Sequence, residues 1–344
     1  MSEHGLNGIF INKPENVRYF SGFSGSSGML LISDGASKLF TDFRYVEQAT
    51  SQAEGYDIIR YTANVYEKLV KSTANLNLTT IGFESDFVTY DVHVELSEAM
   101  PNLTLVPVQI DALRRVKDVN EVASITKAVE IADQAFLHIL SYIRQGISEQ
   151  SIALELEYYM GKLGAEKPAF DTIVASGKRG ALPHGIASQK VIETGDFVTM
   201  DFGAVYQGYH SDITRTICVG KATGKQRNIY EIVLAAQLAG VQAICPGKTG
   251  NVIDAVSRKI IADAGYGEYF GHGLGHSLGL AIHEEPRLSP TNKQTILMEN
   301  MVVTIEPGIY LPEWGGVRIE DTVLVSSAGC EILTASSKQL IEIQ

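Results

Sequence analysis

Short apolar runs separated by turn residues dominate the first part of the chain, to about residue 108. Three runs have the length and composition of buried strands, at residues 8–11, 28–32 and 38–41. Two further segments have an apolar spacing that is compatible with helices, at residues 64–71 and 92–100. This alternation of strands and helices predicts a small α/β domain with a mixed sheet.

From about residue 113 the apolar spacing becomes helical. Apolar side chains recur every three or four positions from Val122 to Leu140, and either Asp118 or Asn120 is suited to cap the start of this helix. Three more helices are predicted, at residues 149–163, 225–243 and 250–264. Strand patterns rich in Val, Ile, Thr and Phe lie between and after them, which predicts a segregated α+β arrangement.

The length of the chain supports two domains, because 344 residues exceed what one hydrophobic core usually spans. We expect an α/β domain over residues 1–112 and an α+β domain over residues 113–344. The composition, with 45% hydrophobic and 20% charged residues, is that of an ordinary globular protein.

The charge and the cysteine content limit the cellular compartments and the classes of binding partner that we expect for this chain. The net charge of −12 argues against a nucleic-acid or an anionic membrane partner, and no apolar run reaches the roughly 18 residues that a spanning helix needs. Residues 1–5 lack the basic and apolar regions of a signal peptide. Three widely spaced cysteines, Cys218, Cys245 and Cys330, favour reduced thiols over disulfides. We therefore expect a cytoplasmic protein.

Two aspartates lie on what the pattern predicts to be a β-hairpin, with strands at residues 197–203 and 209–216. If the hairpin is symmetric about Tyr206 and Gln207, Asp201 and Asp212 are directly paired, with Cβ atoms about 4.5–5.5 Å apart. Two buried carboxylates at that distance repel each other unless a proton or a cation lies between them. A pair of metal ions would remove this repulsion.

Two glutamates interrupt otherwise buried strand patterns near the C-terminus. Glu306 ends the run 302–306, and Glu320 lies within the run 316–323. An acidic residue in such a run needs a partner, and for either glutamate alone a salt bridge is the simpler explanation. Together with the two aspartates, the glutamates indicate a metal centre.

Three of the eight histidines, His272, His276 and His283, follow one another in a glycine-rich segment between the two predicted carboxylate pairs. Mixed carboxylate and imidazole ligands suit Mn²⁺, Co²⁺, Fe²⁺ or Zn²⁺ in a catalytic site, whereas a structural zinc site favours cysteine. Four carboxylates also balance the charge of two divalent ions. The set fits a two-metal hydrolase, in which the ions activate a bridging water and polarise the scissile carbonyl.

In these contexts the order Asp, Asp, His, Glu, Glu resembles the pita-bread metallopeptidases, a family that includes methionine aminopeptidase, aminopeptidase P and prolidase. Segments 181–185, 306–310 and 316–321 look most like those of Xaa-Pro aminopeptidases and Xaa-Pro dipeptidases. Residues 1–112 resemble the creatinase/prolidase N-terminal domain in size. The resemblance implies a pita-bread fold for residues 113–344.

The resemblance also assigns a role to each of five metal-binding residues. It implies that Asp201, Asp212 and Glu320 hold both ions or hold one bidentately, and that His276 and Glu306 are ligands of one ion. It further implies that Glu306 carries the proton of the attacking water. A ligating carboxylate is chemically able to accept such a proton.

Four residues around the metal centre are assigned supporting roles by the same resemblance. His184 and His283 are implied to contact the substrate and to stabilise the tetrahedral intermediate, since an imidazole can donate to a developing oxyanion. His272 and Arg318 are implied to support the metal centre. Arg318 precedes Glu320 by two strand positions, so we expect it on the same face, where it can orient a carboxylate bidentately.

The expected activity is that of an exopeptidase that cleaves the Xaa-Pro bond of dipeptides or of peptide N-termini through a metal-bridging water. The expected cofactors are two divalent ions, with Mn²⁺ first and Co²⁺, Fe²⁺ or Zn²⁺ as alternatives. The expected partners are a peptide with proline in the second position and a second copy of the chain in a homodimer. An aminopeptidase of non-prolyl specificity and a metal-free binding or scaffold protein remain alternatives.

Five other features have more ordinary interpretations. Residues 24–28 lack the Lys-Ser/Thr of a phosphate loop and are expected to be a simple connection. Residues 42–45 are expected to join a strand to a helix. His210 is expected to pack away from the metal face, and Asp321 is expected to point away from its neighbour Glu320. Trp314 either lines the pocket or packs against the scaffold or a partner subunit.

Overall fold

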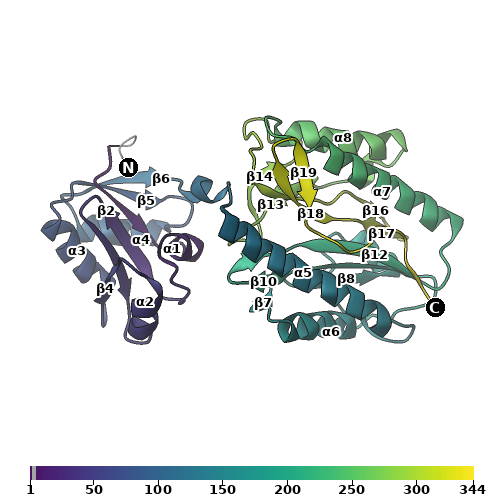
Figure 1. Cartoon of the computed structure of the whole chain (residues 1–344), viewed down its shortest axis with the longest axis horizontal. Coiled ribbons are helices and arrows are strands. Elements are labelled where there is room, and N and C mark those ends of the chain that lie inside the picture. The colour runs from purple at the N-terminus through teal and green to yellow at the C-terminus, as the bar shows by residue number, and fades with distance from the viewer. Residues whose placement is uncertain (2–4) are drawn as a thin grey trace. The chain divides into compact units, whose positions relative to one another are not determined.

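The chain folds into two compact units, Met1–Leu113 and Arg114–Gln344, in a computed structural model that describes residue 1 and residues 5–344 (Figure 1). Part of the N-terminal segment that was searched for a signal peptide, residues 2–4, therefore lies outside the described residues. Among the residues that are described, no helix combines the length and the apolar character needed to cross a membrane.

A six-stranded mixed sheet forms the centre of the N-terminal unit. Its strand order is β4-β3-β2-β1-β5-β6, with β1 antiparallel to β2 and parallel to β5. The strands are β1 (Gly8–Ile11), β2 (Met29–Ser33), β3 (Ala36–Thr41), β4 (Asp57–Arg60), β5 (Thr80–Glu84) and β6 (Thr104–Val108). The helices are α1 (Pro14–Ser21), α2 (Val46–Gln52), α3 (Val65–Asn75) and α4 (Tyr90–Ala99). This mixed sheet confirms the predicted α/β class.

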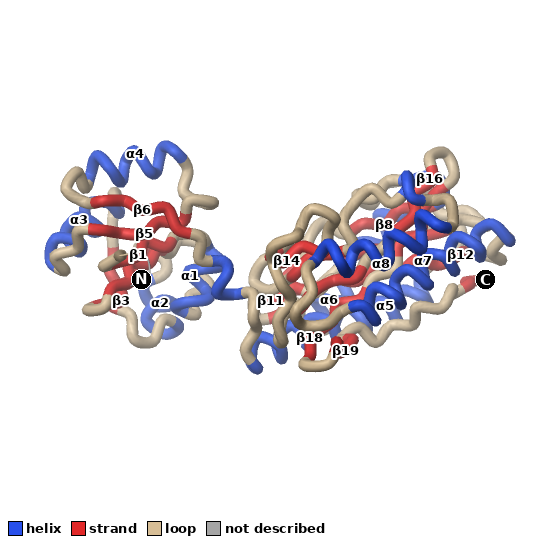
Figure 2. Tube along the Cα trace, turned by 90° about the horizontal axis from the view of Figure 1, so that it is seen from above, coloured by secondary structure: helices blue, strands red, loops and turns tan. Residues whose placement is uncertain are grey.

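Helices cover both faces of this sheet (Figure 2). Leu30 and Leu39 pack with α1 and α2 in one core, whereas Leu31 and Phe40 pack with α3 and α4 in another. Successive strand residues point to opposite faces, so a sheet that is covered twice needs continuous apolar runs. This requirement explains why these strands appear in the sequence as unbroken apolar segments.

Helix α1 was not predicted, because a residue far away in the sequence completes its N-terminus. Its N-cap, Lys13, makes no side-chain capping hydrogen bond. The buried carboxylate of Glu84, at the end of β5, instead accepts hydrogen bonds from the backbone N–H groups of Asn12 and Lys13, at 2.7 and 2.8 Å. Glu84 thereby satisfies the amide of the N-cap, Lys13, which the third helical residue of a capping box would otherwise satisfy, and also the amide of Asn12 before it.

The C-terminal unit consists of two sheet systems, each covered by a pair of helices (Figure 1). Helices α5 and α6 pack on the sheet β20-β12-β9-β8, whereas α7 and α8 pack on the side of the sheet β14-β13-β15-β18-β19. The helices are α5 (Val119–Tyr142), α6 (Glu149–Lys162), α7 (Gly224–Ala243) and α8 (Gly250–Asp263). Strands and helices are segregated, as the α+β prediction expected.

Small sheets connect these two systems. The first is β11-β10-β7 and the second is the hairpin β16-β17. The strands before α7 are β7 (Lys167–Pro168), β8 (Ile173–Ser176), β9 (Phe197–Phe202), β10 (Ala204–Tyr206), β11 (Tyr209–His210) and β12 (Ile213–Val219). The strands after α8 are β13 (Gly275–Ser277), β14 (Glu284–Leu288), β15 (Val302–Ile305), β16 (Gly308–Leu311), β17 (Gly315–Arg318), β18 (Asp321–Ser326), β19 (Gly329–Ile332) and β20 (Glu342–Ile343).

Helix α5 begins with a reciprocal cap. Of the two candidates, Asp118 is the capping residue: its carboxylate accepts hydrogen bonds from the backbone N–H groups of Asn120 and Glu121, at 2.7 and 2.9 Å. The Glu121 carboxylate in turn accepts a hydrogen bond from the backbone N–H of Asp118, which completes a capping box. The start of this helix is therefore defined by residues close together in the sequence, which is why it was predictable.

The predicted direct pairing of Asp201 with Asp212 is wrong. Asp201 pairs with Thr214, so Asp212 lies two residues before the position that is directly opposite Asp201. The two turn residues are Gln207 and Gly208, with φ of 47° and 79°, as in a two-residue hairpin turn of the primed type. The turn is centred one residue later than assumed, which shifts the register by two. Because side chains alternate with a period of two, this shift preserves the face.

Candidate metal centre

Three carboxylates converge where two sheets of the C-terminal unit meet. Asp201 lies on β9, Asp212 precedes β12, and Glu320 lies between β17 and β18. Each offers an oxygen within 4.8 Å of the oxygens of the other two. The atoms Asp201 Oδ1, Asp212 Oδ1 and Glu320 Oε1 are buried and have no hydrogen-bond partner. Buried acceptors without partners are costly, so three of them on carboxylates that lie this close together indicate a site that a cation would satisfy.

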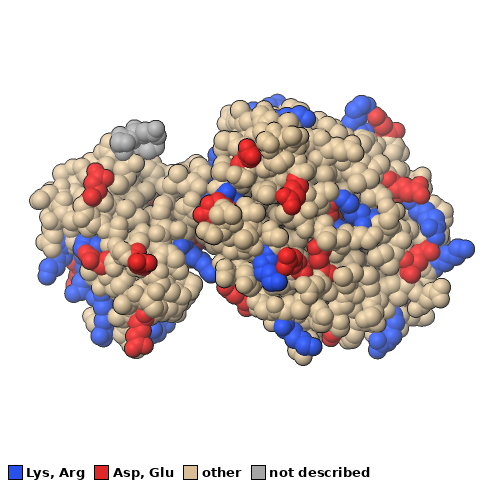
Figure 3. All heavy atoms as spheres, viewed as in Figure 1, with Lys and Arg blue, Asp and Glu red and all other residues tan. Residues whose placement is uncertain are grey.

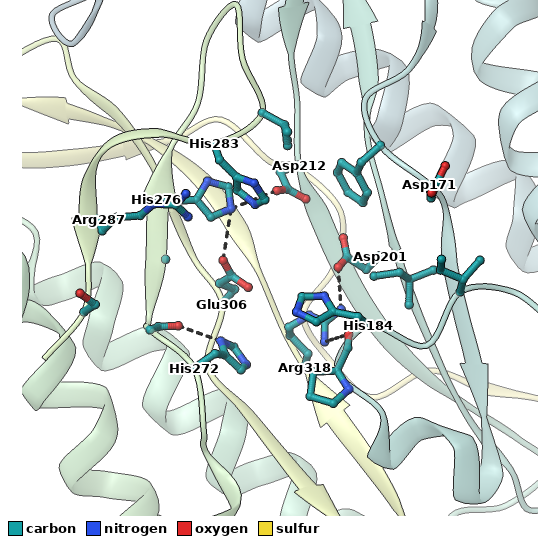
Figure 4. Close-up of a pocket in the computed structure, with 18 residues that line it drawn as sticks. Asp171, His184, Asp201, Asp212, His272, His276, His283, Arg287, Glu306 and Arg318 are labelled. Carbon is teal, nitrogen blue, oxygen red and sulfur yellow. Dashed lines mark hydrogen bonds and ion pairs between the residues drawn. The ribbon is translucent and has the colours of Figure 1, made fainter. Parts of the chain in front are cut away.

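His276 and Glu306 lie across the pocket from Asp201, with His276 beside Asp212 (Figure 4). His276 Nε2 is 3.5 Å from Asp212 Oδ2 and 3.4 Å from Glu306 Oε1. The other ring nitrogen, Nδ1, lies 3.1 Å from the backbone carbonyl oxygen of Ser277. A proton on Nδ1 for that hydrogen bond leaves Nε2 as the acceptor that a metal ion requires.

The charges of this group are balanced poorly by protein atoms alone. Burial, together with the neighbouring carboxylates, raises the pKa of Asp212 and of Glu320 well above their usual range. Burial, with a contribution from Asp201, raises the pKa of Glu306 to about 8. Burial, with a contribution from His283, lowers the pKa of His276 to about 3, so its imidazole is neutral. Unpaired carboxylate oxygens beside a neutral imidazole fit divalent cations of the Mn²⁺ or Zn²⁺ type.

Arg318, at the end of β17, does not grip a carboxylate bidentately as expected. Its Nη2 donates to Asp201 Oδ2 at 2.6 Å, and its Nε donates to Thr214 Oγ1 at 3.0 Å. The remaining nitrogen, Nη1, donates to the Tyr310 hydroxyl at 2.8 Å and to the Pro183 carbonyl at 3.2 Å. The bidentate prediction is wrong because four different segments share the donors of this guanidinium.

Thr214 is a residue of this site that the sequence reasoning missed. Its hydroxyl accepts a hydrogen bond from Arg318 and donates one to Glu320 Oε2 at 2.7 Å. The available signal was its position, since Thr214 follows Asp212 by two residues and therefore shares its strand face. It holds one oxygen of Glu320, whose other oxygen remains unpaired.

The predicted histidines line the same pocket, whose volume is about 570 Å³. His283 and His276 are in edge-to-face contact, with ring centroids 4.5 Å apart. His272 Nε2 lies 2.9 Å from the Tyr310 hydroxyl, and burial lowers the pKa of His272 to about 4. The predicted residues that line the pocket are His184, Asp201, Asp212, His272, His276, His283, Glu306 and Arg318.

Other pocket residues were not singled out from the sequence. Two of them are charged and exposed, Asp171 and Arg287, and Figure 4 shows them on opposite sides of the pocket. Both occur at surface positions where charged residues are common, so no pattern in the sequence marked them. Five apolar side chains also line the pocket: Phe170, Ile173, Pro183, Ile186 and Ile282.

Comparison with known proteins decides the family. Residues 123–327 match the model of metallopeptidase family M24, and residues 1–116 match the creatinase/prolidase N-terminal domain. The chain belongs to metallopeptidase family M24. It is 44% identical to the Xaa-Pro dipeptidase of Pyrococcus furiosus, over 99% of this chain and 97% of that protein.

Solved structures of this family share the fold over nearly the whole chain. An Xaa-Pro dipeptidase from Bacillus anthracis matches with a TM-score of 0.96 and 49% identity, covering 99% of this chain and 96% of that one. An X-Pro aminopeptidase from Thermotoga maritima matches with a TM-score of 0.93 and 40% identity, covering 99% of each chain. The two-domain fold and the predicted membership of the pita-bread metallopeptidases are thereby confirmed.

Three residues for which the sequence suggested no catalytic role, Asp321, His210 and Trp314, make contacts with the scaffold of this M24 metallopeptidase. Asp321 points away from Glu320 and pairs with a buried arginine, as described below. His210 directs its Nδ1 toward the carbonyl oxygen of Gly279, at 3.1 Å. Trp314 packs edge-on against Phe197, with ring centroids 6.1 Å apart, and is absent from the lining of the described pocket. The scaffold alternative for Trp314 therefore agrees with its contacts.

Two predicted connections are ordinary loops in the structure. Residues 42–45 join β3 to α2, and the Asp42 carboxylate pairs with Arg44 at 2.7 Å. Residues 24–28 join α1 to β2, and the hydroxyl of Ser26 hydrogen-bonds with that of Tyr45 at 2.7 Å. Both segments belong to the framework of the N-terminal unit.

Proposed function

We propose that this metallopeptidase is a dinuclear-metal exopeptidase that hydrolyses the Xaa-Pro bond of dipeptides or of peptide N-termini. The convergence of unpaired buried oxygens from Asp201, Asp212 and Glu320 is the observation that carries the proposal. Its prolyl specificity is supported by relatives named Xaa-Pro dipeptidase and X-Pro aminopeptidase.

Five residues would hold the ions: Asp201, Asp212, His276, Glu306 and Glu320. Mn²⁺ is our first candidate, with Co²⁺, Fe²⁺ and Zn²⁺ as alternatives, because all four accept this combination of ligands. Bound there, the ions would lower the pKa of a water molecule and polarise the scissile carbonyl.

The residues of the chain supply the proton transfers and the hydrogen bonds. Glu306, whose carboxylate faces the pocket, accepts a proton from the attacking water and delivers it to the leaving amine. His184 and His283 donate hydrogen bonds to the oxygen that becomes negative in the transition state. Arg318 fixes the carboxylate of Asp201, and His272 fixes Tyr310.

The wall of the pocket fits a short peptide that carries both charges. The apolar side chains of Phe170, Ile173 and Ile282 offer a surface for a proline ring. Arg287 offers a guanidinium for a carboxylate, and Asp171 faces it from the other side with an acidic group. This arrangement suits a zwitterionic dipeptide better than an extended chain.

A paired assay tests the proposal. Enzyme stripped of metal and reconstituted with Mn²⁺ or Co²⁺ is given Ala-Pro, Ala-Pro-Ala and, as a non-prolyl control, Ala-Ala. Cleavage of Ala-Pro alone indicates a dipeptidase, and cleavage of both prolyl peptides indicates an aminopeptidase. Hydrolysis of Ala-Ala at the same rate refutes prolyl specificity. Folded enzyme without any activity refutes the proposed enzyme function and favours a binding or scaffold protein.

We further propose a cytoplasmic homodimer without a nucleic-acid partner. All three cysteines are free thiols, as in proteins of a reducing compartment. On the face drawn in Figure 3, basic side chains are interspersed with acidic ones. Sedimentation equilibrium measures the dimer directly, and a monomer mass at micromolar concentration refutes it.

A further inference from the structure

A buried carboxylate directly follows His283 in the sequence. Glu284, the first residue of β14, pairs with two cations: Arg114 Nε lies 3.2 Å from its Oε1, and Lys117 Nζ lies 3.2 Å from its Oε2. The exposed fractions of the three side chains are 4% for Glu284, 2% for Arg114 and 1% for Lys117. Neither cation belongs to the candidate metal centre, and both lie about 170 positions away in the sequence.

The same carboxylate closes the loop that carries His283. Glu284 Oε1 accepts a hydrogen bond from the backbone N–H of Ala281 at 3.1 Å. A side chain at Gly279 would place its Cβ 2.9 Å from Glu284 Oε2, so this glycine provides the room for the carboxylate. The carbonyl oxygen of Gly279 in turn accepts a hydrogen bond from the backbone N–H of His210 at 2.8 Å. Residues 279–284 are therefore held at both ends.

Together with its neighbour Ile282, His283 is a residue of this loop that lines the pocket. Its ring packs edge-on against His276, and it lines the pocket together with Glu306 (Figure 4). A misplacement of about 1 Å can cost a catalytic group about two orders of magnitude in rate. The position of the imidazole thus depends on how firmly the loop is fixed.

We propose that Glu284 is a positioning residue for His283, and that Arg114 and Lys117 fix it by a buried charge pairing. The proposal rests on the proposed function, in which His283 contacts the substrate. Glu284 touches no substrate in this scheme and acts only through the loop. Two buried cations need an anion between them, so the charge of Glu284, rather than its shape alone, maintains the arrangement.

Three substitutions separate charge from shape. Glu284→Gln keeps the shape and removes the charge, Glu284→Asp keeps the charge and shortens the reach, and Lys117→Met removes one cation. The matched control is Glu84→Gln, which neutralises another buried carboxylate that accepts backbone hydrogen bonds, in the N-terminal unit. The readouts are kcat and KM for Ala-Pro, bound metal, and hydrogen exchange at the Ala281 amide.

We expect Glu284→Gln to lower kcat by about 10- to 100-fold, with KM and bound metal within about twofold of the parent. Glu284→Asp should recover at least part of this loss. Hydrogen exchange at the Ala281 amide should become faster in Glu284→Gln and, to a smaller extent, in Lys117→Met, but not in Glu84→Gln. Lys117→Met should lower kcat by a smaller factor than Glu284→Gln. The double variant should have a kcat close to that of Glu284→Gln alone, because both substitutions disrupt the same buried charge pairing. Glu84→Gln should leave kcat unchanged.

Two results would overturn the positioning role. One is a kcat within twofold of the parent in folded Glu284→Gln and Lys117→Met enzymes. The other is a loss of kcat that follows the loss of bound metal, which would make Glu284 a support of the metal centre only. If the parent enzyme cleaves neither Ala-Pro nor Ala-Pro-Ala, the proposed function fails. Exchange at Ala281 then still tests whether Glu284 fixes the loop.

Discussion

The guanidinium of Arg215, on β12, lies 2.8 Å from the carboxylate of Asp321, the residue that follows Glu320. The Nη1 atom of the same arginine donates a hydrogen bond to the backbone carbonyl of Glu320. Both charged side chains are buried, with exposed fractions of 1% and 0%. Arg215, which is not among the residues that line the pocket, therefore holds the backbone that presents Glu320 to the candidate metal centre.

Arg215→Met is expected to lower the free energy of unfolding by about 1.5–3 kcal/mol, because Asp321 loses its buried guanidinium partner but keeps Lys338 as a second one. Urea unfolding followed by the fluorescence of Trp314, the only tryptophan, measures this change in the C-terminal unit. The double variant Arg215→Met/Asp321→Leu should lose less than the sum of the two single changes. A loss below about 1 kcal/mol in Arg215→Met would contradict this account.

Stability of the metal-free enzyme should fall as the pH rises from about 7 to 8. The raised pKa of Glu306, about 8, means that the native state keeps a proton that the unfolded chain has already released. Stability then decreases by up to about 1.4 kcal/mol per pH unit for each such proton, until the pH exceeds the native pKa.

The histidines do not obscure this effect. The lowered pKa values of His276, about 3, and His272, about 4, leave both rings neutral in the native state above pH 7, where the unfolded chain is also mostly neutral. Urea unfolding of chelator-treated enzyme at pH 7 and pH 8 measures the slope. Saturating Mn²⁺ should abolish it, because the ion replaces the proton. A flat profile in the metal-free enzyme would count against the carboxylate cluster.

Asp212→Asn is expected to weaken metal binding at least 100-fold and to abolish hydrolysis, since it removes a charge between three other carboxylates. Asp263→Asn, at an exposed ion pair on α8, is the control and should retain both properties. Elemental analysis after dialysis and calorimetric titration with Mn²⁺ measure the change. Full metal occupancy in folded Asp212→Asn would remove this residue from the proposed ligands.

Thr214→Val is expected to weaken metal binding by about 10- to 100-fold, because Glu320 loses the hydroxyl that orients it and Arg318 loses an acceptor. Thr216→Val is a matched control, since its hydroxyl is equally buried on β12 but donates to the Arg318 carbonyl at 3.0 Å. Only the first variant should change the affinity for Mn²⁺ in titration. An equal loss of Mn²⁺ affinity in both variants would indicate a general effect on β12.

The residue types of the metal centre were predictable because each one breaks a pattern. Asp201, Glu306 and Glu320 are acidic residues at or beside the ends of apolar strands, and the histidines cluster in a segment rich in glycine. Helix α5 was predictable because its cap is local. These signals lie within a few residues of the feature that they predict.

The contacts that organise the site were not predictable, because they join distant segments. Lys117 pairs with Glu284 across 167 positions, and Thr214 donates to Glu320 across 106. The hairpin register depended on the positive φ of Gln207, a conformation that a residue other than glycine rarely adopts. The sequence pattern therefore identifies the polar side chains that interrupt apolar runs, but it does not identify the residues that they contact.

The sheet that carries Asp201 is completed by the last strand of the chain. Strand β20 pairs in parallel with β12, next to β9 in the order β20-β12-β9-β8. Glu320 also follows Asp201 by about 120 positions, which a ribosome needs about 6 to 24 s to add at about 5–20 residues per second. During that interval the nascent chain contains Asp201 and Asp212 but not yet Glu320. The three carboxylates that form the candidate metal centre can therefore meet only after synthesis has passed Glu320.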